Sequence, residues 1–233
     1  MTRAARRLEH AGQPDLFGEA PVAAIEGLRY ENGFLSREEE AGLLTIVQAF
    51  PLKEMRYKEY TARRRGTSFG GSYDFDTNRL KPGASLPPEL HPLRDKAAAW
   101  AGIAPEELTH MLIAEYRPGT PLGWHRDVPD FEDIVGISLN NDAVMQFRPY
   151  VPGAAASGPA TLEFLIEPRS VYLLRGPARW AWQHAIAPTE ALRYSITLRT
   201  RAHRVRTSPA PSPSSPSSRS SAARTAGLPP TGR

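Results

Sequence analysis

The chain contains no cysteine among its 233 residues. Disulfide bonds and thiolate zinc sites are therefore excluded, and any metal site has to use histidine and carboxylate ligands. No apolar run approaches the roughly 20 residues of a membrane-spanning helix. The chain also does not open with the charged-then-apolar pattern of a signal peptide. We therefore expect a cytoplasmic protein with no membrane partner.

Acidic residues are absent from the end of the chain. Residues 202–233 carry five arginines and no acid, whereas the whole chain has 29 basic and 25 acidic residues. The remainder has 24 basic and 25 acidic groups, a net charge of about −1, so the sequence does not show a globally basic nucleic-acid-binding body. The same stretch is rich in Pro, Ser and Ala and cannot build a core, which predicts a disordered tail over 202–233.

Two helices are predicted ahead of residue 103. Ser36 and Glu39 have the spacing of a capping box, and an apolar stripe follows them. Residues 87–102 form a second core-facing pattern at helical spacing. We therefore expect four regions along the chain: a flexible segment at 1–20, a helical support and substrate-lid region at 21–102, a main domain at 103–201 and the tail at 202–233.

From His110 onward the apolar pattern alternates and is interrupted by Pro and Gly turns, which is typical of short strands. With the segment that carries His125, about eight strands are expected. The other seven are 111–117, 134–139, 144–148, 161–166, 170–174, 180–186 and 194–200. The pattern predicts an α+β protein with a double-stranded β-helix (jelly roll) core, two flanking N-terminal helices and a disordered C-terminal tail.

A candidate metal site comes from three residues. His125 and Asp127 are two positions apart, so on an extended segment both side chains leave the same face. His184 lies 57 positions after Asp127 and would complete a 2-His-1-carboxylate triad, which leaves positions open for O2 chemistry at Fe(II). The His-x-Asp pair alone is also compatible with a surface histidine beside a solvated aspartate. A jelly roll would bring the three residues together.

The downstream residues point to a known family. His-x-Asp, the distal His184 and then Arg193-x-Ser195-x-Thr197-x-Arg199 resemble the AlkB family of Fe(II)/2-oxoglutarate dioxygenases, over about residues 103–201. The resemblance implies Fe(II) as cofactor, 2-oxoglutarate as co-substrate and O2. It makes His125, Asp127 and His184 the metal ligands and catalytic residues.

The resemblance also assigns residues to 2-oxoglutarate. Arg193 matches the arginine whose planar fork holds the far carboxylate of the co-substrate. Arg199 lies at even spacing from it and matches a second arginine near the metal, with Ser195 between them in the same motif. Tyr116 matches a tyrosine that hydrogen-bonds the co-substrate. The alternative reading of the two arginines is a pair of surface salt bridges.

A segment ahead of the predicted jelly roll interleaves cations with aromatics, as a phosphate-and-base surface requires. Its glycines would let it bend as a lid. The resemblance makes Phe69 and Tyr73 candidates for contacting a base, and Arg63, Arg64 and Arg65 supply charge for substrate binding. An ordinary hairpin with solvated charges is the alternative.

Two positions depart from the family pattern. Ala114 stands where the family often has Asn, which removes one co-substrate hydrogen bond. Pro129 stands where members that repair nucleic acids commonly carry a carboxylate. Asp130 and Glu132 are the candidate replacements, and without one of them recognition of a cationic alkylated base is in doubt.

The expected function is Fe(II)- and 2-oxoglutarate-dependent oxidative dealkylation of N-alkylated bases in DNA or RNA. The substrate would be single-stranded or flipped, because the target atom has to reach the metal. We expect a monomer with no protein partner. One alternative is a hydroxylase or demethylase of a protein or small molecule, which Pro129 and the near-neutral body favour. Another is a non-catalytic jelly-roll module that binds a metal, which has no need of Arg193 and Arg199.

Overall fold

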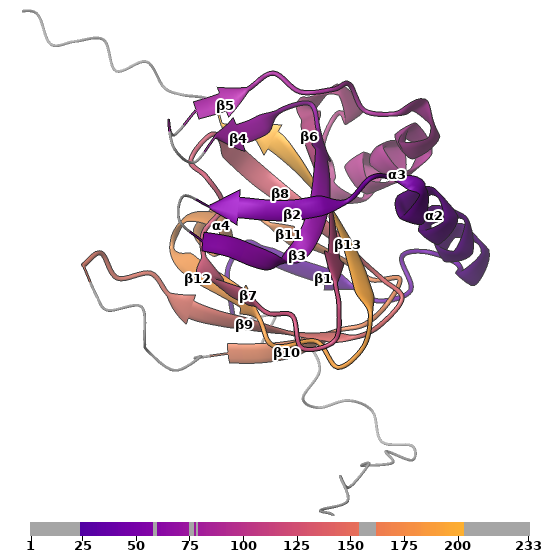
Figure 1. Cartoon of the computed structure of the whole chain (residues 1–233). Helices are drawn as coiled ribbons and strands as arrows, with labels where there is room; N and C mark the ends of the chain where they lie inside the picture. The colour runs from indigo at the N-terminus through magenta and orange to yellow at the C-terminus, as the bar shows by residue number, and fades with distance from the viewer. Residues whose placement is uncertain (1–23, 58–59, 75–76, 78, 154–161, 203–233) are drawn as a thin grey trace, which may run out of the picture. The chain divides into compact units, whose positions relative to one another are not determined.

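Two antiparallel β-sheets form the framework of the computed structural model, which describes residues 24–57, 60–74, 77, 79–153 and 162–202. The larger sheet has seven strands in the order β1-β11-β8-β13-β6-β3-β2, and the smaller has four in the order β10-β9-β12-β7. Strands that are neighbours in space are mostly distant in sequence, as in the predicted jelly roll (Figure 1). A separate two-stranded hairpin pairs β4 with β5.

From residue 108 onward the strands lie close to the ranges that the sequence pattern predicts, apart from the start of the strand predicted at 180–186. The strands of the larger sheet are β1 (Leu28–Glu31), β2 (Lys53–Tyr57), β3 (Tyr60–Phe69), β6 (Leu108–Tyr116), β8 (Phe131–Leu139), β11 (Val171–Leu174) and β13 (Arg193–Arg201). Those of the smaller sheet are β7 (Leu122–His125), β9 (Ala143–Pro149), β10 (Leu162–Ile166) and β12 (Trp182–Ile186). The hairpin consists of β4 (Ser72–Asp74) and β5 (Arg79–Lys81).

Both predicted helices are present. Helix α2 (Arg37–Ala49) begins at the capping box, in which the Ser36 side chain accepts a hydrogen bond from the Glu39 backbone and the Glu39 side chain accepts one from the Ser36 backbone. A 3-10 turn, η1 (Pro88–Leu90), leads into α3 (His91–Ala101), and α3 ends at Gly102 in the left-handed conformation. A second 3-10 turn, η2 (Pro105–Glu107), precedes β6.

The larger sheet has two different faces. On β13, Tyr194, Ile196 and Leu198 belong to a core cluster that also contains buried side chains of α2 and α3, so the helices cover this face (Figure 1). The intervening residues of β13 line a pocket on the other face. A second apolar cluster, which includes Met145 and Phe147 of β9, fills the space on that side. The pocket thus lies between the two sheets.

Three features differ from the sequence prediction. Strands β1, β2 and β3 precede residue 103 yet belong to the same sheet as β6 and β13, so the proposed boundary at 103 does not separate two structural regions. The predicted lid segment contains β3, which pairs with β6 from Arg65 to Phe69 and is a fixed part of the sheet. The strand predicted at 180–186 begins later, because Pro177 at the first helical position starts the short helix α4 (Pro177–Trp180).

The segment predicted to be flexible, 1–20, and the tail predicted to be disordered, 202–233, lie outside the described residues except for Ala202. Within the described part of the chain, none of the helices has the length and apolar character needed to cross a membrane.

Candidate active site

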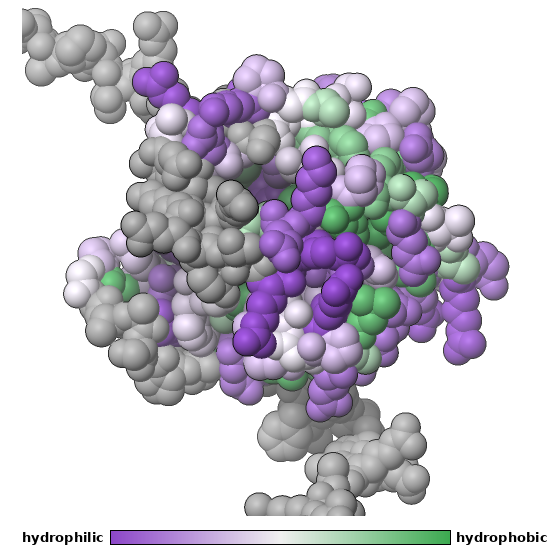
Figure 2. All heavy atoms as spheres, in the orientation of Figure 1, coloured by the Kyte–Doolittle hydropathy of each residue, from purple (hydrophilic) through white to green (hydrophobic). Residues whose placement is uncertain are grey.

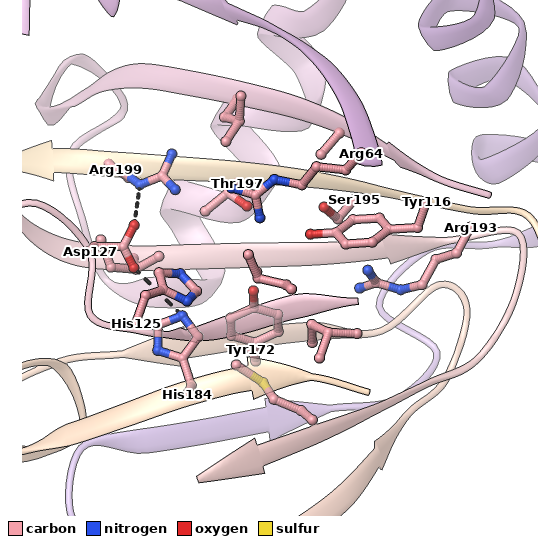
Figure 3. A pocket seen from close by; sticks show the side chains of 16 residues that line it. Arg64, Tyr116, His125, Asp127, Tyr172, His184, Arg193, Ser195, Thr197 and Arg199 are labelled. Atoms are coloured by element: carbon pink, nitrogen blue, oxygen red, sulfur yellow. Dashed lines mark hydrogen bonds and ion pairs between the residues drawn. The ribbon is translucent and has the colours of Figure 1, made fainter. Parts of the chain in front are cut away.

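The pocket between the sheets has two chemically different ends. It encloses about 500 Å³ of space, part of it open to solvent. The three residues of the predicted triad lie at one end and Arg193 lies at the other (Figure 3). All seven residues predicted for metal and co-substrate line this pocket: Tyr116, His125, Asp127, His184, Arg193, Ser195 and Arg199.

The smaller sheet brings the triad together. His125 of β7 and His184 of β12 are directly paired across the two strands, and their rings lie 4.2 Å apart. Asp127 follows β7, and its Oδ2 lies 3.8 Å from Nε2 of His184. One potential ligand atom from each of the three residues lies within 4.8 Å of the others, so the triad can hold a single metal ion.

Hydrogen bonds orient two of the three ligands. Nδ1 of His125 lies 2.9 Å from the carbonyl oxygen of Gly123, to which it can donate. This bond fixes the tautomer and leaves Nε2 free to bind a metal. Nε of Arg199 donates to Oδ1 of Asp127 at 2.8 Å, which leaves Oδ2 on the side of His184. The donors are therefore arranged before any metal binds.

The protonation states also suit a metal. Burial, and after it the nearby His125, lower the pKa of His184 to about 3. Burial likewise lowers the pKa of His125. Burial alone would raise the pKa of Asp127, but Arg199 and the two imidazoles overcome that effect and hold it well below its usual range. At neutral pH the site therefore offers two neutral imidazoles and one carboxylate, the donor set that fits Fe(II) with open coordination positions.

Arg193 dominates the other end of the pocket. Its side chain is 1% exposed, and Nε donates to Oγ of Ser138 at 3.0 Å. Among the described residues no carboxylate forms an ion pair with it. A buried cation without an acidic partner is costly, so this end of the pocket is suited to an anionic ligand. A dicarboxylate could bind a metal at the triad with one carboxylate and Arg193 with the other, so such a ligand suits both ends of the pocket.

Two tyrosines lie beside Arg193. The guanidinium carbon of Arg193 is 5.1 Å from the centre of the Tyr116 ring, and both Tyr116 and Tyr172 line the pocket. Burial raises the pKa of Tyr172 to about 12, so its hydroxyl stays protonated and able to donate. A Cβ on Gly136 would lie 2.0 Å from the Tyr172 ring, so glycine is required at position 136. The sequence analysis did not identify Tyr172; the glycine inside β8 is the signal that could have indicated a close approach.

Arg179 holds the loop that carries Asp127. It is 2% exposed, and its Nη2 donates to the carbonyl oxygens of Asp127 at 3.0 Å, Val128 at 2.8 Å and Phe131 at 2.9 Å. These backbone groups connect β7 to β8, so Arg179 fixes the segment immediately after the candidate carboxylate ligand. The sequence analysis also missed this residue, because its partners are carbonyl groups that leave no pattern in the sequence.

The three consecutive arginines of β3, at positions 63–65, are divided between the two faces of the larger sheet. Arg64 is 7% exposed and lines the pocket. Arg65 points to the opposite face, where its guanidinium forms two hydrogen bonds of 2.9 Å with Glu115. Alternation along β3 places the exposed Arg63 on the same side as Arg65. Figure 2 shows hydrophilic side chains gathered over β2 and β3.

The two aromatic candidates do not reach the pocket. Phe69 is 8% exposed and packs edge-on against Phe50, with ring centres 5.2 Å apart, inside the core beneath the helices. Its position on the helix-covered face leaves no room for a base, which corrects that part of the prediction. Tyr73 lies on the separate hairpin and is not among the described residues that line the pocket.

Of the two departures from the family pattern, Ala114 lies in the pocket and Pro129 does not line it. Ala114 lines the wall where a larger polar residue was expected. Pro129 is exposed, and neither Asp130 nor Glu132 lines the pocket. Oε1 of Glu132 accepts a hydrogen bond of 2.8 Å from the Trp180 indole instead. Asp127 is therefore the one acidic residue among the described residues that line the pocket.

Comparison with known proteins agrees with this geometry. The model of the 2OG-Fe(II) oxygenase superfamily matches residues 27–208. The alkylated DNA repair protein ALKBH8 homolog of Arabidopsis thaliana is 30% identical over 182 residues, which cover 70% of this chain and 51% of that protein. The alpha-ketoglutarate-dependent dioxygenase AlkB of Escherichia coli (strain K12) is 30% identical over 151 residues, 60% of this chain and 66% of that protein.

These shares mean that the chain spans between half and two thirds of the length of the two relatives. Among solved structures, OsALKBH1 covers 75% of this chain and 96% of its own, with a TM-score of 0.57 and 14% identity. That likeness shows the jelly-roll fold. The superfamily match over residues 27–208 shows that the chain belongs to the 2OG-Fe(II) oxygenase superfamily, and within it the chain is similar to AlkB proteins.

Proposed function

We propose that this protein oxidatively removes alkyl groups from the nitrogens of nucleic-acid bases. The observation that carries the proposal is the two-ended pocket, with a candidate metal triad at one end and, at the other, a buried guanidinium that forms no ion pair with any carboxylate in the described part of the chain. The relatives named for alkylated DNA repair and as AlkB support the substrate class.

Each residue has a distinct role in this proposal. His125, Asp127 and His184 hold Fe(II), while Arg199 orients the carboxylate of Asp127. Arg193 binds the far carboxylate of 2-oxoglutarate, and Ser138 holds the guanidinium in place. Ser195 and Tyr116 supply further polar contacts along the co-substrate, and the apolar walls formed by residues such as Met145 exclude water.

When bound, Fe(II) and 2-oxoglutarate supply the oxidation of an N-alkyl C–H bond by O2, with succinate and CO2 as co-products. The hydroxylated alkyl group then leaves as an aldehyde and the unmodified base is restored. His184 is 7% exposed, so a base stacked inside a duplex could not bring its alkyl group to the triad. The substrate is therefore a single-stranded or flipped base.

Succinate formation tests the proposal. Purified protein with Fe(II), ascorbate and 2-oxoglutarate is assayed with a methylated single-stranded oligonucleotide, with the unmethylated oligonucleotide and with neither. We expect the methylated strand alone to stimulate succinate formation and to release an equal amount of formaldehyde. His184→Ala is the matched control and should give neither product. Equal succinate with methylated and unmethylated strands would contradict the proposed substrate class.

A second candidate function is hydroxylation or demethylation of a protein or small molecule. It is favoured by Pro129, which replaces the expected carboxylate, and by the position of Arg63 and Arg65 on the face away from the pocket. In that case 2-oxoglutarate would be turned over slowly in all the oligonucleotide assays, and a peptide or metabolite mixture would stimulate succinate formation.

A further inference from the structure

Arg199 contacts a buried histidine as well as the candidate carboxylate ligand. Its Nε donates to Oδ1 of Asp127 at 2.8 Å, and its Nη1 lies 3.3 Å from Nδ1 of His110, to which it can donate. Arg199 is 8% exposed and His110 is 6% exposed, so little water competes for these hydrogen bonds. One guanidinium group therefore joins the triad to a histidine that is not part of it.

The β-sheet fixes the positions of both residues. His110 of β6 is directly paired with Arg199 of β13, so the two side chains leave the same face of the larger sheet. Arg199 and Asp127 line the pocket, whereas His110 is not among the described residues that do so. His110 can therefore affect the triad only through its neighbours, and Arg199 is the neighbour that it hydrogen-bonds.

His110 is suited to accept this hydrogen bond. Burial, and after it the charge of Arg199, lower the pKa of His110 to about 3, so the ring is neutral at neutral pH. A guanidinium group has donors only, so it favours the tautomer that carries its proton on Nε2 and leaves Nδ1 as the acceptor. An apolar side chain at position 110 would leave a buried N–H group of Arg199 without this partner, which is costly.

Phe131 covers the same guanidinium. The centre of its ring lies 4.7 Å from that of the His110 ring and 5.5 Å from the guanidinium carbon of Arg199. Phe131 is 3% exposed, and its carbonyl oxygen accepts a hydrogen bond of 2.9 Å from Nη2 of Arg179, so the ring has a fixed position. Arg199 is thus held by two hydrogen bonds and by packing against one ring, which leaves it little freedom to turn.

We infer that His110 is a positioning residue of the iron site and acts through Arg199. By accepting a hydrogen bond it fixes the guanidinium, which in turn holds Oδ1 of Asp127 and leaves Oδ2 on the side of His184 (Figure 3). Hydrogen bonds behind a ligand set its orientation and so its affinity for the metal. The inference rests on the triad as the iron site, and it holds for any substrate of the enzyme.

An anaerobic titration with Fe(II) at saturating 2-oxoglutarate tests the inference. The visible absorption of the complex gives an apparent Kd for iron without turnover. His110→Leu removes the acceptor and should raise this Kd roughly tenfold. His110→Asn offers Oδ1 near the place of Nδ1 and should restore an affinity close to that of the wild type. His91→Leu, the same change on α3 outside the pocket, is the matched control and should leave the Kd unchanged.

A double variant separates action through Arg199 from a general effect of packing. In an Arg199→Met background, His110→Leu should not weaken iron binding further, because the residue through which it acts is absent. If Arg199→Met binds no iron, the comparison of His110→Leu with His110→Asn decides. Circular-dichroism melts check the fold, and if His110→Leu does not fold, His110→Met supplies a more adaptable apolar side chain.

The outcomes are distinct. An unchanged Kd in His110→Leu, a Kd in His110→Asn as high as in His110→Leu, or the same loss with and without Arg199 overturns the inference and leaves the triad intact. Iron binding by His184→Ala as tight as that of the wild type overturns the triad itself, and this inference with it.

Discussion

The two sheets of this protein contribute different chemistry to one pocket. The smaller sheet provides both imidazoles, from β7 and β12, and Asp127 follows directly after β7. The larger sheet provides the cations and hydroxyls, among them Arg64 of β3, Tyr116 of β6 and Arg193 of β13. The candidate metal ligands thus come from one side of the pocket and the candidate anion-binding groups from the other.

This separation indicates how the family's chemistry is built on a jelly roll. Side chains alternate along each strand, so β13 places Tyr194, Ile196 and Leu198 in the helix-covered core while its intervening residues face the pocket. The same strand therefore stabilises the fold and carries the residues proposed to bind the co-substrate.

The largest expected effect on activity comes from removing a candidate metal ligand. His184→Ala removes one of three donors from a preformed site, and succinate formation should fall to background while the fold persists. Circular dichroism and the melting temperature check the fold, and the rate of 2-oxoglutarate turnover checks the activity. More than a small residual fraction of wild-type turnover would show that His184 is not a ligand.

A substitution at the co-substrate end of the pocket should have a smaller effect, mainly on the affinity for 2-oxoglutarate. Arg193→Lys keeps the charge but loses the planar fork, so the apparent affinity for 2-oxoglutarate should fall about tenfold to a hundredfold, roughly 1.4–3 kcal/mol. The kcat at saturating 2-oxoglutarate should change much less. Steady-state kinetics measures both values, and an unchanged KM for 2-oxoglutarate would remove Arg193 from the co-substrate site.

The contact between Gly136 and Tyr172 gives a third prediction, on stability. In Gly136→Ala the new Cβ collides with the Tyr172 ring, which lies 2.0 Å away, so the free energy of unfolding should fall by about 1–3 kcal/mol. The double variant Gly136→Ala with Tyr172→Leu removes the collision. In urea unfolding, Gly136→Ala should therefore lower the free energy of unfolding less in the Tyr172→Leu background than in the wild type. Equal costs in both backgrounds would contradict the proposed contact.

The smallest effect concerns pH. Burial lowers the pKa of His110 from 6.5 to about 3, and Nη1 of Arg199 lies 3.3 Å from its Nδ1, where it can donate to an unprotonated ring. Between these pH values the folded state binds fewer protons than the unfolded state, so stability falls as the pH drops below 6.5. Near pH 5, His110 should lower the free energy of unfolding by about 1 kcal/mol for each pH unit that the pH falls.

Urea unfolding at pH 7.5 and pH 5.5 measures this dependence. In His110→Asn the loss of stability between the two pH values should be smaller than in the wild type by an amount of that order. His91→Asn on α3 is the matched control. The same loss in the His110 variant and the wild type would show that this ring does not couple folding to protons.

Much of the fold and of the candidate site could be predicted from local patterns. The capping box at Ser36 marked the start of α2, and alternating apolar residues marked β6, β8, β9 and β13. His125, Asp127, His184, Arg193 and Arg199 lie together in the pocket as expected. The even spacing of Arg193 and Arg199 on β13 puts both side chains on the same face of the strand.

Other features depend on contacts between distant strands and could not be predicted. Three consecutive arginines on β3 must alternate between faces, but the sequence does not tell which of them faces the pocket. Tyr172 and Ser138 reach the site only through the pairing of β11, β8 and β13. Arg179 contacts carbonyl groups, and any residue type can supply a carbonyl.

The most direct test of the two-sided pocket is an anaerobic titration of the Fe(II)-loaded protein with 2-oxoglutarate. The visible charge-transfer absorption that appears when the co-substrate chelates the iron reports both sides of the pocket at once. Wild-type protein should reach full absorption at one iron and one 2-oxoglutarate per chain, His184→Ala should give no absorption, and Arg193→Lys should reach the wild-type level only at higher 2-oxoglutarate. Wild-type absorption in His184→Ala, or unchanged 2-oxoglutarate affinity in Arg193→Lys, would contradict the division of the pocket between a metal side and a co-substrate side.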